Sequence, residues 1–129
     1  MEAAGQKLIL VIDDDRDILE AIRIMLETAG FGVETAIDSM HGLAKVKETN
    51  PNLIIVDMMM ETVDAGVKVT EELKNTGCSA PILLLSSIGE ATSYNLDIAS
   101  MGFAGVIQKP VMPSVLIPLI RRKLNIPDK

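Results

Sequence analysis

Four short apolar runs, each ending abruptly at polar side chains, constrain the fold of this 129-residue chain more than any other feature. They are Leu8–Ile12, Leu53–Val56, Ile82–Leu85 and Gly105–Ile107. Runs that are apolar at every position bury both faces of a strand, which is typical of a parallel sheet covered on both sides. A weaker alternating stretch, Phe31–Ala36, predicts a fifth strand at an edge of the sheet.

Helical periodicity fills the segments between these runs, and helix caps or stops bound most of them. Pro118 lies inside the last of these segments, and we expect that helix to be kinked or to start late because proline lacks a backbone donor. The expected helices are one with an apolar stripe from Ile18 to Ala29, one capped by Asp38 or Ser39 and running to Glu48, one capped by Asp64 and running to about Asn75, one from about Glu90 to Met101, and one beginning near Pro113.

Strands that alternate with helices through short connections form right-handed crossovers. The sequence therefore predicts an α/β fold with a doubly wound parallel sheet and helices on both faces. No linker, repeat or low-complexity segment interrupts it, so we expect one domain over residues 1–129, with its core at about 7–124 and no effector module.

Composition excludes several classes of function. The net charge is −6, aromatic residues are 2% of the chain, and no basic cluster exceeds Arg121–Lys123, so no nucleic acid is expected to bind. No apolar run approaches the roughly 18 residues that a membrane span needs, and Met1–Lys7 does not resemble a signal peptide. The single cysteine, Cys78, indicates a reducing compartment. We expect a cytoplasmic protein.

The residues that follow the predicted strands carry the chemistry. Asp13–Asp15, Asp57, Ser86 and Lys109 each stand at the carboxyl end of a strand, where open α/β sheets bind ligands. Clustered carboxylates repel one another unless a cation lies among them, and Mg²⁺ prefers oxygen ligands of this kind. With Asp57 as nucleophile, Lys109 as a second cation and Ser86 as a hydrogen-bond donor, such a set suits phosphoryl transfer. Each residue alone also fits an ordinary cap, turn or surface role.

In these motifs the chain resembles the receiver domains of two-component response regulators, in particular those like the chemotaxis regulators. The resemblance extends from about Lys7 to Leu124 and implies a flavodoxin-like sheet with strand order 2-1-3-4-5. The residues that carry it are Leu10–Asp15, Leu53–Met60, Asp64, Pro81–Ser87 and Gln108–Pro110.

The resemblance also implies the roles of the site residues. Asp57 would accept the phosphoryl group and would bind Mg²⁺, or Mn²⁺ as a substitute. Asp14 would bind the metal directly, Asp13 partly through water, and Met59 through its backbone carbonyl.

By the same resemblance, Ser86 would be the switch hydroxyl and Lys109 the phosphate-binding cation, with a cis peptide bond before Pro110. The phosphoryl donor would be a histidine kinase or a histidine phosphotransfer protein, and the downstream target is unknown. The domain would turn over no independent substrate. A homodimer through the fourth helix, fifth strand and last helix is a further expectation.

The chain departs from the family pattern at several positions. Glu61 replaces the usual proline, and Ala65 precedes the glycine that usually follows Asp64 directly. Val106 stands where many members carry a tyrosine or phenylalanine that moves inward on activation, so we expect a reduced change on the face of the fourth helix, fifth strand and last helix. The resemblance also implies that the side chains two residues after Asp57 and two after Ser86 influence attack of water on the acyl phosphate. Met59 and Ile88 stand there, are apolar and cannot orient a water molecule, so we expect a long-lived phosphoryl group.

Three other functions compete with this interpretation. A phosphatase with an aspartyl-phosphate intermediate needs a second aspartate two residues after its nucleophile, where this chain has Met59. A flavin carrier needs a phosphate-binding loop after the first strand, where this chain has three aspartates. A pseudo-receiver, which binds partners without phosphorylation, conflicts with the complete set of site residues, although Val106 is compatible with it.

Overall fold

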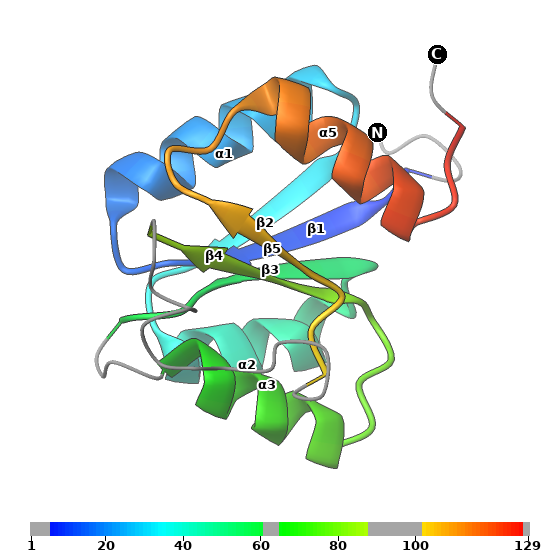
Figure 1. Cartoon of the computed structure of the whole chain (residues 1–129). Coiled ribbons are helices and arrows are strands. Elements are labelled where there is room, and N and C mark those ends of the chain that lie inside the picture. Colours follow the sequence, from blue (N-terminus) through cyan, green and yellow to red (C-terminus); the bar gives the residue numbers. More distant parts are fainter. Residues whose placement is uncertain (1–5, 61–64, 88–101, 128–129) are drawn as a thin grey trace.

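The computed structural model describes residues 6–60, 65–87 and 102–127, and it contains one parallel sheet of five strands in the order β2-β1-β3-β4-β5 (Figure 1). This order and the doubly wound architecture confirm the predicted fold. The strands are β1 (Leu8–Ile12), β2 (Gly32–Ala36), β3 (Leu53–Asp57), β4 (Ile82–Ser86) and β5 (Gly105–Gln108).

Three strands extend one residue beyond the predicted apolar runs. β3 includes Asp57, β4 includes Ser86 and β5 includes Gln108. In the sheet Asp57 pairs with Leu85, and Ser86 pairs with Gln108. The polar residues at these ends therefore have backbone positions fixed by the sheet. At the edge, β2 begins one residue later than predicted, at Gly32.

Helices cover both faces of the sheet. α1 (Arg16–Thr28) and α5 (Pro113–Lys123) lie on one face, and α2 (Ser39–Thr49) and α3 (Ala65–Asn75) lie on the other (Figure 1). The helix expected over residues 90–101 and the predicted cap Asp64 lie outside the described residues. Within the described part of the chain, no helix has the length and apolar character that a membrane crossing requires.

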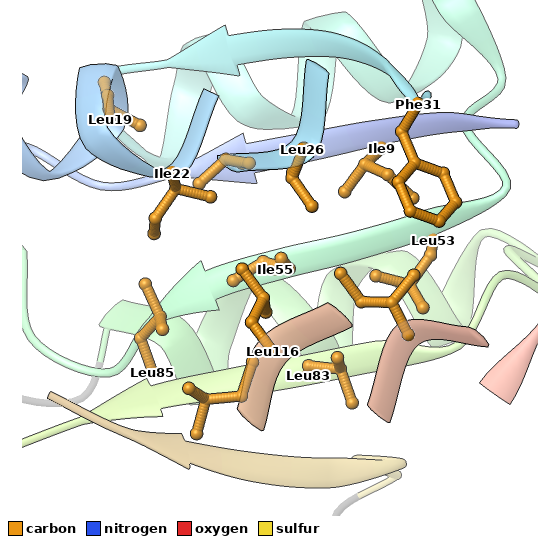
Figure 2. Close-up of a cluster of buried hydrophobic side chains, with 13 residues drawn as sticks. Ile9, Leu19, Ile22, Leu26, Phe31, Leu53, Ile55, Leu83, Leu85 and Leu116 are labelled. Atoms are coloured by element: carbon orange, nitrogen blue, oxygen red, sulfur yellow. The ribbon is translucent and has the colours of Figure 1, made fainter. Parts of the chain in front are cut away.

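Two apolar cores result, because successive side chains of a strand point to opposite faces. The first packs Ile9 and Val11 of β1 against α1 and α5 (Figure 2). The second packs Leu10 and Ile12 against the α2 and α3 side. All four of these β1 side chains are fully buried, so the strand ends that carry the polar residues are anchored on both sides.

Aspartates cap two of the helices. The side chain of Asp15 accepts hydrogen bonds from the backbone N–H groups of Asp17 and Ile18 at the start of α1. The side chain of Asp38 accepts a hydrogen bond from the backbone N–H of His41 at the start of α2. Of the two predicted caps, Asp38 and Ser39, the structure therefore has Asp38. Side-chain oxygens at this position satisfy donors that the helix leaves without partners.

The last helix corrects one expectation. It begins at Pro113, where proline needs no backbone donor, and it continues through Pro118 to Lys123, so the prediction of a late start is wrong. Because Pro118 has no backbone N–H, the carbonyl of Ser114, four residues earlier, receives no hydrogen bond from it. Ser114 is exposed, so water can donate to this carbonyl instead.

An arginine of α5 contacts the far end of α1. The guanidinium of Arg121 lies 5.8 Å from the ring centroid of Phe31, and its Nη2 donates to the carbonyl of Ala29 at 3.5 Å. The last turn of α1 carries no basic residue of its own. Arg121 therefore supplies, from another helix, the positive charge that stabilises a helix C-terminus.

Candidate functional site

Three strand ends bring two carboxylates and an ammonium group together at one edge of the sheet. Asp13 follows β1, Asp57 ends β3 and Lys109 follows β5. Lys109 Nζ lies 3.2 Å from Asp57 Oδ1 and 3.4 Å from Asp13 Oδ2. The carboxyl-end rule for open sheets predicted this meeting.

Asp13 is the deepest of these groups, with no exposed surface. Its Oδ1 accepts a hydrogen bond from the backbone N–H of Asp15 at 2.9 Å, and its own N–H donates to the carbonyl of Ala36. Its Oδ2 makes no hydrogen bond with any described residue and has only the charge contact with Lys109. Burial raises the pKa of Asp13 above its ordinary value, against the opposing effects of the Asp15 N–H and of Lys109.

Lys109 stays charged between the two acids. Burial alone would lower the pKa of Lys109, but the charges of Asp13 and Asp57 outweigh it and raise this pKa. Its backbone N–H donates to the carbonyl of Ser86, and its bond to Pro110 is cis, as the resemblance implies. The lysine is thus held at both its backbone and its ammonium group.

The carboxylates form a set of oxygen ligands. One oxygen from each of Asp13, Asp14 and Asp57 lies within 4.8 Å of the others. Asp13 and Asp57 are buried, whereas Asp14 is exposed, so the set opens to solvent on one side. A hard divalent ion that keeps some of its waters fits such a site, and Oδ2 of Asp13 is a buried oxygen with room for a further partner.

Ser86 ends β4, the strand next to the one that Asp57 ends, but its hydroxyl does not donate its hydrogen bond to Asp57. Ser86 is buried, and its hydroxyl donates to the carbonyl of Ser87 at 2.9 Å. Met59, two residues after Asp57, is half-buried. Ile88 and Glu61 lie outside the described residues.

Gly66 is a close neighbour of Asp57 that sequence reasoning noted only as a departure from the family pattern. A Cβ atom at this position would lie 2.9 Å from the Cα of Met58 and closer still to the carbonyl oxygen of Asp57. A glycine in the first turn of the helix after the third strand was the signal that could have predicted this approach.

Other singled-out residues take no part in this cluster. His41 is on the surface, with Nδ1 2.7 Å from Oδ1 of Asp38. Met58 is buried in the second core, and Met60 packs against it, which agrees with a packing role. Cys78 is half-buried in the loop after α3.

A groove of about 500 Å³ borders the site. Its wall on α1 is formed by Ile18, Ala21 and Met25, and its opposite wall by Lys109 and Val111. The lining is mostly apolar, and Lys109 belongs both to the groove and to the charged cluster. The groove therefore adjoins the charged cluster through Lys109, which lies 3.2 Å from Asp57.

Comparisons with known proteins agree on one family. The family model described as response regulator receiver domain matches residues 9–121. "Response regulator MprA" of Mycobacterium leprae (strain TN) is 33% identical over 117 residues, and that of Mycobacterium avium (strain 104) is 38% identical. Each match covers 91% of this chain and 50% of the relative, so the chain spans about half the length of these relatives.

Solved structures give the same result. A response regulator receiver domain protein from Clostridium thermocellum superimposes with a TM-score of 0.82 at 30% identity, covering 92% of this chain and 94% of that one. The chemotaxis response regulator CheY4 of Vibrio cholerae superimposes with a TM-score of 0.81 at 27% identity, covering 93% and 100%.

Proposed function

Because this chain belongs to the response regulator receiver domain family, which acts in two-component signalling, we propose that Asp57 accepts a phosphoryl group from a phosphohistidine. The observation that carries the proposal is the position of Lys109, whose ammonium group lies 3.2 Å from Asp57 and 3.4 Å from Asp13. A nucleophile beside a fixed cation and further carboxylates is the arrangement that phosphoryl transfer requires.

In the transfer, an oxygen of the Asp57 carboxylate attacks phosphorus and a new P–O bond forms. The P–N bond of the donor phosphohistidine breaks, and its electron pair leaves with the imidazole ring. Lys109 balances the negative charge of the equatorial oxygens as a point charge. The product is an acyl phosphate on the chain itself, so we propose no turnover of an independent substrate.

The three carboxylates fit Mg²⁺, with Mn²⁺ as a substitute. Asp13, Asp14 and Asp57 would hold the ion together with the backbone carbonyl of Met59, and the buried Oδ2 of Asp13 supports this assignment. When bound, the ion neutralises charge on the phosphoryl oxygens.

Ser86 is the proposed switch hydroxyl. It now donates to the carbonyl of Ser87, and a phosphoryl group on Asp57 offers a stronger, charged acceptor. Reorientation of this donor and of Lys109 shifts the population between two conformations. Val106 is half-buried at the second core and has no ring to move, so we propose a reduced change around β5 and α5.

We propose that the donor, a histidine kinase or a histidine phosphotransfer protein, docks in the groove between α1 and the loop after β5. The groove is mostly apolar and reaches Lys109, so a helix placed there brings its histidine to Asp57. The downstream target is a separate partner, and a homodimer through the face that includes β5 and α5 is a candidate output. The compartment we propose is the cytoplasm, since the single cysteine fits a reducing environment.

The intact mass of the protein after incubation with acetyl phosphate and MgCl₂ tests this function. We expect a gain of one phosphoryl group that Asp57→Asn and EDTA both abolish. Circular dichroism confirms that each sample is folded. No gain in folded wild-type protein contradicts the proposal and favours the pseudo-receiver.

The metal assignment has its own test. Asp13→Asn keeps an acceptor for the Asp15 N–H but removes a charged ligand, so we expect MgCl₂ to raise the urea midpoint of the wild type and not of this variant. An equal rise in both contradicts the role of Asp13.

A further inference from the structure

A chain of hydrogen bonds joins β4 to the interior of α3 through the residue that follows Asp57. The N–H of Met58 donates to the carbonyl of Leu85 at 2.9 Å, and its carbonyl accepts from the N–H of Gly66 at 3.0 Å. The hydroxyl of Thr70 then donates to the carbonyl of Gly66 at 2.9 Å. Both backbone groups of Met58 are therefore fixed, one by the sheet and one by the first turn of α3.

Gly66 makes this attachment sterically demanding. A Cβ atom at this position would meet three backbone atoms. The carbonyl carbon of Asp57 would lie 3.0 Å away, and the carbonyl oxygen of Asp57 and the Cα atom of Met58 would lie closer. Backbone atoms cannot rotate away as the end of a flexible side chain can. The first turn of α3 thus lies directly on the peptide bond between Asp57 and Met58, with no space between them.

Thr70 is a buried polar residue that the proposed function does not otherwise use. It has no exposed surface, and its hydroxyl reaches back four residues along its own helix, a bond that slightly destabilises helices in general. Placed here, the bond holds the carbonyl of Gly66, whose peptide plane adjoins, through the Gly66 Cα atom, the plane whose N–H donates to the carbonyl of Met58.

We propose that Thr70 and Gly66 are positioning residues, which hold the Asp57–Met59 backbone where its carboxylate and carbonyl oxygens can bind the divalent cation together. The inference rests on the proposed function for the identity of the ligand set. It assigns to α3 the task that outer groups perform at metal sites, where they orient the ligands without touching the ion.

The chain offers a matched control for Thr70. Thr49 in α2 also donates its hydroxyl to the carbonyl four residues earlier, Lys45, at 2.7 Å, in a helix that contributes no ligand to the proposed site. Thr70→Val and Thr49→Val therefore remove the same type of bond and keep the shape of the side chain. Only Thr70→Val also removes a hydrogen bond to Gly66, the residue whose N–H donates to Met58.

The test is isothermal titration of Mg²⁺ into metal-free wild-type protein, Thr70→Val, Thr70→Ser and Thr49→Val. We expect Thr70→Val to weaken Mg²⁺ binding by about 10-fold, the lower end for outer groups at metal sites. Thr70→Ser restores the hydroxyl, so it and Thr49→Val should bind as the wild type does. Equal affinities for the two valine variants overturn the inference, because a purely structural hydroxyl would change stability alone.

A second measurement uses the wild-type protein and does not depend on whether a variant folds. In metal-free protein the Gly66 amide should exchange with solvent as slowly as the amides of β3, because its bond to Met58 is part of the core. Exchange as fast as in surface turns overturns the inference.

The two proposals fail in different ways. Wild-type protein that binds no Mg²⁺ and gains no phosphoryl group removes the proposed function and this inference with it. Wild-type protein that does both, while Thr70→Val matches Thr49→Val, removes the inference alone.

Discussion

The ammonium group of Lys109 lies 3.2 Å from Oδ1 of Asp57, so the proposed phosphoacceptor is paired with a cation before any phosphoryl group arrives. Both groups are largely removed from water, so loss of either one would leave a poorly solvated charge behind. The pairing also places a cation beside the proposed acyl phosphate. The ammonium group of Lys109 can contact the carboxylate before transfer and the phosphoryl oxygens after it.

Lys109→Met should destabilise the metal-free protein by about 3 kcal/mol, the cost of leaving a buried charge without its partner. Mg²⁺ should then stabilise the variant more than the wild type, because the ion replaces the missing positive charge among the carboxylates. Urea denaturation with and without MgCl₂ measures both effects. Lys123→Met, at an exposed lysine of α5, is the control, and a Lys109→Met variant as stable as this control contradicts the argument.

The phosphoryl group should persist for minutes to hours, because the Met59 side chain cannot orient a water molecule for attack on the acyl phosphate. Met59→Asn supplies a polar group at the same half-buried position and should shorten the half-life. Loss of the phosphoryl mass with time, after removal of acetyl phosphate, measures it. A wild-type half-life of seconds contradicts the expectation.

Arg121→Gln should lower stability by about 1 kcal/mol, since it removes a cation from the ring of Phe31 and from the C-terminus of α1. The gain of a phosphoryl group should be unchanged, because Arg121 has no contact with the site residues. Arg122 follows it on α5 and is exposed, so Arg122→Gln is the matched control. The prediction fails if both variants lose the same stability in thermal unfolding.

The carboxyl group of Asp38 should make the free energy of unfolding depend on pH in the acidic range. The backbone N–H of His41, followed by its side chain, lowers the pKa of Asp38 below the ordinary value of 3.8. The unfolded chain then binds more protons than the folded one, so stability rises with pH in this window. The contribution is fully present above pH 3.8 and is lost as the pH falls through the lower, folded value.

Asp38→Asn keeps the cap and removes this titration, so the stability difference between wild type and variant should shrink as the pH falls below 3.8. Carboxyl ¹³C shifts of the wild type should show a midpoint for Asp38 below that value. A midpoint at or above it refutes the assigned hydrogen bonds.

The sequence was sufficient for the strands, their burial and the meeting of Asp13, Asp57 and Lys109, because apolar runs and the carboxyl-end rule depend on residue types alone. Strand ends were predicted one residue short at Asp57 and Ser86. Pairing in a sheet uses backbone groups, so a polar side chain does not end a strand. The start of α5 near Pro113 was predicted correctly. Only the alternative of a late start was wrong, because the donor that Pro118 lacks would face an exposed residue, where its loss costs little.

The fine structure of the site was beyond the sequence. Which oxygen of Asp13 is satisfied by Asp15 and which is left for another partner depends on a side-chain rotamer and on depth. The contact of Gly66 with the peptide bond after Asp57 depends on how closely a helix approaches a strand. Neither quantity is encoded in a periodic pattern.

The site is divided among β1, β3 and β5, with whole strand–helix units between them in the chain. Parallel strands joined in this way pair only after long stretches of chain have ordered, which makes such sheets slow to form. A truncated, nascent or misfolded copy therefore holds Asp57 without Lys109 and Asp13 beside it. The proposed phosphoacceptor site is therefore complete only in a fully folded domain.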